Sequence, residues 1–102
     1  MSPLEIQNLI ADRAADYCRR NGIRSLRLFG SHARGEATDS SDVDLLVEFE
    51  PGEHVGMFGL SRMQIELGEI LGVPVDLRTT AELSRYFRAQ VVSESRPLYA
   101  GR

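Results

Sequence analysis

The sequence predicts an α/β (α+β) fold in which helices flank a small, mixed β-sheet. Two segments, residues 2–21 and 57–71, carry apolar side chains at three- and four-residue spacing, which is the pattern of a helix with one buried face. Three shorter apolar segments, at residues 25–30, 42–50 and 73–78, alternate with them and have the length of strands. Because a helix must bury its apolar stripe against another element, this alternation favours helices packed on a sheet.

The first helix is predicted at residues 2–21. Residues 2–5 (Ser-Pro-Leu-Glu) combine a serine cap, a proline in the first turn and a glutamate three residues after the cap, which together mark a helix start. An Asn-Gly pair at residues 21–22 marks its end. The apolar stripe consists of Ile6, Leu9, Ile10, Ala14, Tyr17 and Cys18. Cys18 is therefore expected to pack in the core rather than to act as a nucleophile.

The central segment is predicted to run strand, turn, strand. Residues 25–30 form the first strand, and residues 31–41 form a turn containing glycine and serine, with a short helical piece. Residues 42–50 form the second strand. One face of this strand is apolar and can pack under the helices; it carries Val43, Leu45, Val47 and Phe49.

The remaining segment is predicted to run helix, strand, helix and edge strand. The helix at residues 57–71 ends at Gly72, and the third strand follows at residues 73–78. Thr80 is placed to cap a helix that reaches about residue 95. Residues 97–99 add a short edge strand, because proline is tolerated there.

Composition limits the class of protein. With 102 residues, 42% of them hydrophobic, the chain is predicted to form one domain spanning residues 1–102. No apolar run approaches the roughly 20 residues that cross a bilayer, and no signal peptide is expected. A lone cysteine is typical of a reducing, cytoplasmic compartment. The net charge of −3 argues against direct binding of nucleic acid.

All 12 basic residues are arginines, and lysine is absent. This excludes the Walker-A P-loop, the kinase ATP lysine and Schiff-base catalysis, since each requires a lysine. Any phosphate chemistry must therefore use arginine, backbone amides or metal ions.

Two aspartates stand on one face of the second predicted strand. Asp42 and Asp44 are two residues apart, so their Cα atoms are roughly 6.6 Å apart at a strand rise of about 3.3 Å per residue. At a charge separation of ~5 Å and an effective dielectric constant of ~20, the two carboxylates would repel each other by about 3 kcal/mol. Carboxylates at this spacing suit Mg²⁺ or Mn²⁺. The alternative is an Asp-x-Asp pair that merely begins the strand.

A third aspartate lies in the third predicted strand. Asp76 is flanked by apolar residues, and an unpaired carboxylate is costly to bury there. If this strand pairs beside the second one, Asp76 can point to the same face as Asp42 and Asp44. Three such carboxylates are what a two-metal phosphoryl-transfer site needs.

The turn after the first strand can contact phosphate. Gly30 allows close approach of backbone amides, and Ser31 adds a hydroxyl and an amide donor. Arg34 can either reach the same phosphates or pair with acidic neighbours such as Glu36 on the surface. His32, between them, either contacts a phosphate or is a solvated loop residue, and the solvated residue is favoured. On the last predicted helix, residues 85–88 (Arg-Tyr-Phe-Arg) either face a partner or a nucleotide base or form a solvated face, and the solvated face is favoured.

Together these segments resemble the nucleotidyltransferase superfamily related to DNA polymerase β, and specifically its minimal nucleotidyltransferase branch. The family pattern is Gly-Ser-x-Ala-Arg-Gly, a short spacer, and Ser-Asp-x-Asp-Leu-x-Val. Residues 30–35 (Gly-Ser-His-Ala-Arg-Gly) and 41–47 (Ser-Asp-Val-Asp-Leu-Leu-Val) fit it throughout. Residues 72–77 (Gly-Val-Pro-Val-Asp-Leu) resemble the strand that carries the third carboxylate. The resemblance implies the polymerase β-like nucleotidyltransferase fold.

The resemblance also implies an activity and a set of roles. The reaction would transfer AMP from ATP to a hydroxyl, with two Mg²⁺ ions (or Mn²⁺) and release of pyrophosphate. Asp42 and Asp44 would bind the metals, and Asp76 would complete the site and assist deprotonation of the acceptor. Gly30 and Ser31 would hold the β- and γ-phosphates.

Similar minimal proteins are antitoxins of HEPN-domain toxins, and some adenylylate a tyrosine of the toxin. The resemblance therefore implies an adenylyltransferase antitoxin with a HEPN-domain partner. One alternative is a non-catalytic antitoxin that masks its partner. Another is nucleotidyl transfer to a small molecule or an RNA end, against which the net charge and the lack of a substrate domain weigh.

Overall fold

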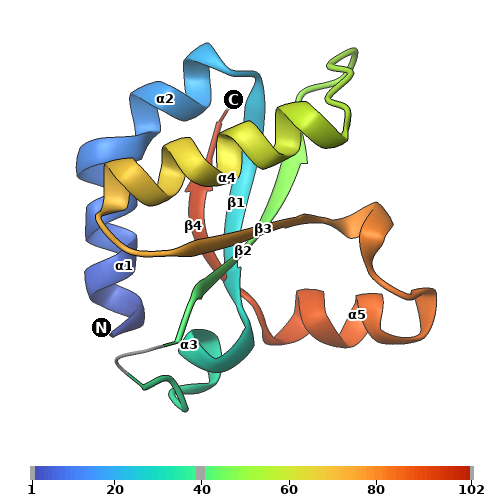
Figure 1. The fold of residues 1–102 in the computed structure, drawn as a ribbon. Coiled ribbons are helices and arrows are strands. Elements are labelled where there is room, and N and C mark those ends of the chain that lie inside the picture. Colours follow the sequence, from blue (N-terminus) through green and yellow to red (C-terminus); the bar gives the residue numbers. More distant parts are fainter. Residues whose placement is uncertain (1, 39–40, 102) are drawn as a thin grey trace.

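A four-stranded mixed sheet forms the centre of the protein (Figure 1). The computed structural model describes residues 2–38 and 41–101. The strands are β1 (Ile23–Phe29), β2 (Val43–Phe49), β3 (Val75–Thr79) and β4 (Arg96–Ala100). Their spatial order is β3-β2-β1-β4, with β1 antiparallel to both β2 and β4 and with β2 parallel to β3. This confirms the predicted fold class and the edge position of the last strand. The third strand pairs beside the second, which is the condition for Asp76 to share the face of Asp44.

The helices are short except for α4. In chain order they are α1 (Pro3–Leu9), a π-helical turn (Ile10–Ala14), α2 (Ala15–Arg20), α3 (Gly30–Arg34), α4 (Met57–Leu71), a 3₁₀ turn (Thr80–Glu82) and α5 (Arg85–Glu94). In the described part of the chain, no helix is both long and apolar enough to cross a bilayer.

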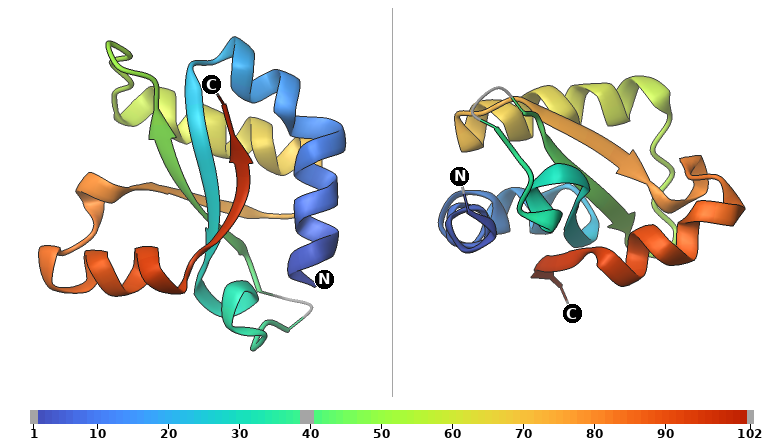
Figure 2. Two further views of the ribbon diagram at one scale, coloured as in Figure 1. Left: turned by 180° about the vertical axis from the view of Figure 1, so that it is seen from behind. Right: turned by 90° about the horizontal axis from the view of Figure 1, so that it is seen from below.

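The core lies on one face of the sheet. There α1, α2 and α4 pack against the strands, as the views in Figures 1 and 2 show. The fully buried side chains of this layer are Ile6, Ile10, Cys18, Ile23, Leu26, Leu28, Val43, Leu45, Val47 and Leu67. Cys18 is thus a core residue, as predicted. Helix α5 lies on the other side of the sheet from α4 (Figure 2, right), and none of its residues is buried.

The N-terminal helix is not the uniform α-helix that the sequence predicts over residues 2–21. The predicted capping box of Ser2 and Glu5 is present, but a π-helical turn interrupts the helix from residue 10 to residue 14. The buried positions Ile6, Ile10, Ala14 and Cys18 recur every four residues, so in a regular helix each would turn about 40° past the previous one. The wider π turn reduces this drift and keeps the stripe on the sheet.

Several predicted boundaries are wrong. Strand β2 covers residues 43–49 rather than 42–50, so Asp42 precedes it, and β3 covers residues 75–79 rather than 73–78. The first strand begins at Ile23 rather than at residue 25, and Gly30 belongs to α3. Thr80 does not cap α5: residues 80–82 form a 3₁₀ turn, and Ser84 accepts a hydrogen bond from the amide of Tyr86 at the start of α5. Of the short helical piece predicted within residues 31–41, the structure contains α3, and residues 39–40 lie outside the described residues.

Candidate active site

The outer face of the sheet, opposite the core, carries two of the predicted acidic residues side by side. In the register of the strands, Asp44 of β2 pairs with Phe29 of β1 on one side and with Asp76 of β3 on the other. Since paired residues of neighbouring strands point to the same face, the Asp44 and Asp76 side chains share the outer face. Both are partly buried.

Asp42 lies just before β2 and is exposed. It is close enough to influence Asp44 electrostatically. On the same face of β2, Leu46 is buried, so the acidic residues border a covered surface rather than a fully solvated one.

Gly30 brings α3 against Asp44. Its φ is +72°, a left-handed conformation that a residue with a Cβ rarely adopts. A Cβ at this position would collide with the Oδ2 atom of Asp44. The glycine in the Gly-Ser motif therefore serves two purposes: it turns the chain from β1 into α3, and it leaves room for the Asp44 carboxylate.

The electrostatic environment of Asp44 disfavours its charge. Burial raises the pKa of the Asp44 carboxyl, and the neighbouring carboxylates of Asp76 and Asp42 raise it further. His32 and Arg78 act in the opposite direction, but the net shift is upward. A positive charge beside Asp44 would therefore be stabilising.

Arg78 pairs with the third aspartate. Its Nε lies 3.4 Å from both carboxylate oxygens of Asp76, and the pair is partly exposed. Arg78 was not among the predicted site residues. It stands two residues after Asp76, so alternation along β3 could have placed it on the same face. A half-exposed pair of this kind contributes little to stability.

The acidic residues do not form a closed metal cage. Within the described ranges, no three histidine, cysteine, aspartate or glutamate side chains are gathered closely enough to hold a cation by themselves. This arrangement still fits Mg²⁺, which usually binds through one or two carboxylates together with substrate phosphates. The oxygen-only donors favour the same kind of hard cation.

The remaining motif residues lie on or beside α3. Ser31 stands in the first turn of α3 and is partly exposed. Of the two alternatives for Arg34, the structure contains the surface pair, in which Arg34 Nε is 3.3 Å from Glu36 Oε2. His32 was wrongly predicted to be solvated: it is 3% exposed, because α3 turns this side chain inward.

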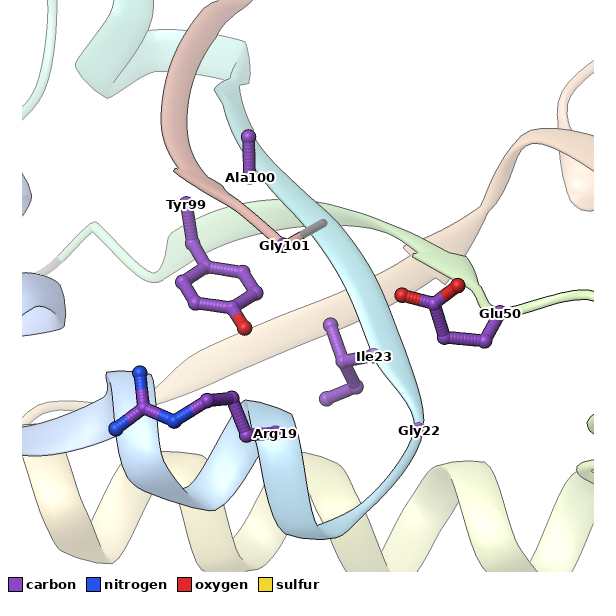
Figure 3. A pocket seen from close by; sticks show the side chains of 7 residues that line it. All are labelled: Arg19, Gly22, Ile23, Glu50, Tyr99, Ala100 and Gly101. Atoms are coloured by element: carbon purple, nitrogen blue, oxygen red, sulfur yellow. The ribbon is translucent and has the colours of Figure 1, made fainter.

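Two cavities bear on where a substrate can bind. One, of about 560 Å³, lies between the start of α4 and β3 and is lined by Asp76 and Arg78 among others. The other, of about 430 Å³, lies near the start of β1, at the opposite end of that strand from Gly30. Figure 3 shows Arg19, Glu50 and Tyr99 around this second cavity. The second cavity contains none of the predicted site residues.

Residues 12–99 match the nucleotidyltransferase domain family. The chain belongs to this family. The protein adenylyltransferase MntA of Thermococcus cleftensis is 33% identical over 90 residues, which are 88% of this chain and 89% of that protein. The resemblance inferred from the Gly-Ser and Asp-x-Asp motifs is thereby confirmed, and the protein is a nucleotidyltransferase.

Solved structures of the family share the fold. A minimal nucleotidyltransferase is 40% identical, with a TM-score of 0.73 over 96% of this chain and 97% of that chain. An antitoxin complex with a tri-AMPylated HEPN toxin from Shewanella oneidensis contains a similar chain, 21% identical, with a TM-score of 0.65 over 96% of this chain and 72% of that one. A toxin–antitoxin structure with AMP-PNP matches at 23% identity and a TM-score of 0.72, covering 94% of this chain and 74% of that chain. The latter two matches concern the fold alone.

Proposed function

We propose that this nucleotidyltransferase transfers AMP from ATP to a protein hydroxyl, and that it acts as the antitoxin of a HEPN-domain toxin. The observation that carries the proposal is the contact of Gly30 with Asp44, with Asp76 next to Asp44 in register. This contact joins the glycine–serine turn to the acidic face, which is what a site for a cation and a triphosphate requires.

We assign the residues the roles that the family resemblance implies, and their positions on the acidic face and in the adjoining turn support this assignment. Asp42, Asp44 and Asp76 would hold the cations, and Gly30 and Ser31 would bind the β- and γ-phosphates. Two bound Mg²⁺ ions, or Mn²⁺ in their place, would offset part of the negative charge of the acidic residues and the triphosphate. Arg34 is paired with Glu36 and would have to leave it to reach a phosphate.

The acceptor hydroxyl would approach Asp76. The cavity beside Asp76 offers space for an acceptor side chain next to the acidic face. In the transfer, the acceptor oxygen would bond to the α-phosphorus as the bond to pyrophosphate breaks, and the Asp76 carboxylate would take the hydroxyl proton.

The identity of the acceptor is proposed from the relatives. MntA is a protein adenylyltransferase, and one structurally similar chain belongs to a complex with an AMPylated HEPN toxin. A HEPN-domain toxin is therefore the proposed acceptor, and the family resemblance implies that a tyrosine of the toxin receives the AMP. Residues 1–102 would act as one minimal nucleotidyltransferase domain, located in the cytoplasm with its partner.

The test uses ATP labelled in the α-phosphate, Mg²⁺, and a HEPN-domain toxin as the proposed partner protein. We expect label on a tyrosine of that protein, and we expect Asp42→Asn combined with Asp44→Asn to lower the rate at least about 100-fold. The matched control is Asp12→Asn with Asp16→Asn, two exposed aspartates on the N-terminal helix.

The same pair of variants separates catalysis from masking. If the Asp42/Asp44 variant still neutralises the toxin in cells, the protein acts by binding and the enzymatic proposal is wrong. If the variant fails to neutralise the toxin while it still binds the partner, AMP transfer is the neutralising step.

A further inference from the structure

His32 is a buried polar residue that the proposed roles leave unexplained. It is 3% exposed, and its Nδ1 is enclosed without a hydrogen-bond partner among residues 2–38 and 41–101. Ser95, also buried, is by contrast fully bonded: it accepts from Arg27 and donates to the carbonyl of Val92. An unpaired buried polar atom costs about 1–3 kcal/mol, so an apolar side chain would be the more stable choice at position 32.

The position of His32 brings it near Asp44. It lies on α3, two residues after Gly30, and the Gly30 backbone lies against the Asp44 carboxylate. Helix α3 packs on both β1 and β2, so a side chain that α3 buries lies close to the end of β2 where Asp44 stands. The influence of His32 on the pKa of Asp44 agrees with this proximity.

We propose that His32 is a positioning residue for Asp44, and that its Nδ1–H donates a hydrogen bond to the Asp44 carboxylate when cation and nucleotide bind. The inference rests on the proposed function. Carboxylates that contact a cation are themselves held by hydrogen bonds from outside, and loss of such a bond typically weakens metal binding by about 10–100-fold. In the free protein the bond is not made, so the proposal assigns its formation to the binding step.

Two substitutions of His32 test which ring nitrogen forms the hydrogen bond. Asparagine places its amide nitrogen near the position of Nδ1, whereas glutamine places it near that of Nε2. We expect His32→Gln to weaken the binding of a Mg²⁺-loaded, non-hydrolysable ATP analogue by about 10–100-fold, and His32→Asn to stay within about threefold of wild type. Calorimetry measures these affinities without catalysis. His54→Gln, in an exposed loop, is the matched control and should bind as wild type.

Measurements of stability and of the ¹⁵N spectrum show whether His32 positions Asp44 or only packs in the core. Without ligand, His32→Leu should unfold with a free energy equal to or above that of wild type, because it removes an unpaired polar atom, yet it should bind the analogue as weakly as His32→Gln. The imidazole ¹⁵N spectrum contains two histidines, and only the Nδ1 signal of His32 should change on adding Mg²⁺ and the analogue.

The outcomes test the assignment of His32 and the proposed function separately. Wild-type affinity in His32→Gln, or equal loss of affinity in the asparagine and glutamine variants, would overturn the assignment. Should His32→Leu fail to fold, the asparagine–glutamine pair still gives the answer. Nucleotide binding that depends on Nδ1, without AMP transfer to the partner, would contradict the proposed function and leave the assignment of His32 intact. Absence of nucleotide binding in wild type would overturn both.

Discussion

Gly30 and Gly35 have nearly the same backbone conformation but different surroundings. Their φ angles are +72° and +73°, yet a Cβ at Gly30 would strike Asp44, whereas a Cβ at Gly35 would have nothing within 4 Å. A substitution at either end of α3 therefore strains the backbone, but only one at Gly30 also displaces the Asp44 carboxylate.

We predict that Gly35→Ala lowers the free energy of unfolding by about 1–2 kcal/mol, because alanine is disfavoured in the left-handed region, and that Gly30→Ala lowers it by at least as much, because the clash with Asp44 adds to this cost. Only Gly30→Ala should impair nucleotide binding, by tenfold or more, since it displaces the Asp44 carboxylate. Denaturant unfolding and calorimetry measure the two effects. Equal losses of binding in both variants would show that the Gly30–Asp44 contact is unimportant.

Asp44 should make the stability of the free protein depend on pH. Its pKa is raised in the folded state, so the folded protein holds this proton more tightly than the unfolded chain does. Ionised Asp44 therefore lowers the free energy of unfolding. This loss is absent below the ordinary aspartate pKa and develops as the pH rises through the folded-state pKa. Asp44→Asn should therefore be more stable than wild type at pH 7, and the difference should vanish near pH 3. A constant difference across this range would contradict the raised pKa.

Among the secondary-structure elements, the outer edge of β3 is connected to α4 by a hydrogen bond to one side chain. The amide of Leu77 donates to the Oε1 atom of Gln64 over 2.8 Å, which satisfies a backbone group that faces away from β2. This bond holds the strand that carries Asp76 against the longest helix.

Gln64→Leu should leave that amide unpaired and lower the free energy of unfolding by about 1–3 kcal/mol. Gln90→Leu, on the exposed face of α5, should change it by less than about 0.5 kcal/mol. Hydrogen exchange at the Leu77 amide, followed by NMR, should be faster only in Gln64→Leu. Unchanged exchange would mean that the Gln64 bond does not protect the edge.

The fold was predictable where periodicity is strong, and less so where spacing is ambiguous. Alternation along β2 placed Asp44 opposite the core, and the apolar segment around Asp76 predicted its strand. The π turn was not predictable, because a spacing of four residues also suits an ordinary helix. Ser84 and Thr80 are both plausible caps, and only packing selects Ser84.

The site was predictable in its acidic residues but not in its surroundings. Motif and alternation identified Asp42, Asp44 and Asp76 as candidates, whereas the burial of His32 depends on which way α3 faces. That orientation follows from the contact between Gly30 and Asp44, which joins segments 14 residues apart and leaves no local signal in the sequence.

For the whole molecule, charge implies a requirement for divalent cations. The protein has a net charge of −3 and no lysine, and it gathers carboxylates where the anionic triphosphate would bind. Coulomb repulsion between these groups opposes binding of free ATP. Removal of Mg²⁺ with EDTA should weaken ATP binding by about tenfold or more. Equal affinity measured with and without EDTA would mean that the nucleotide does not bind at the acidic face.

The most direct test of the account is a crystal structure with Mg²⁺ and a non-hydrolysable ATP analogue. We expect the triphosphate to lie against Gly30 and Ser31, with cations bound between the triphosphate and Asp44. Nucleotide in the distant cavity beside Arg19 and Tyr99, with the Asp44 carboxylate in contact with neither cation nor phosphate, would contradict it.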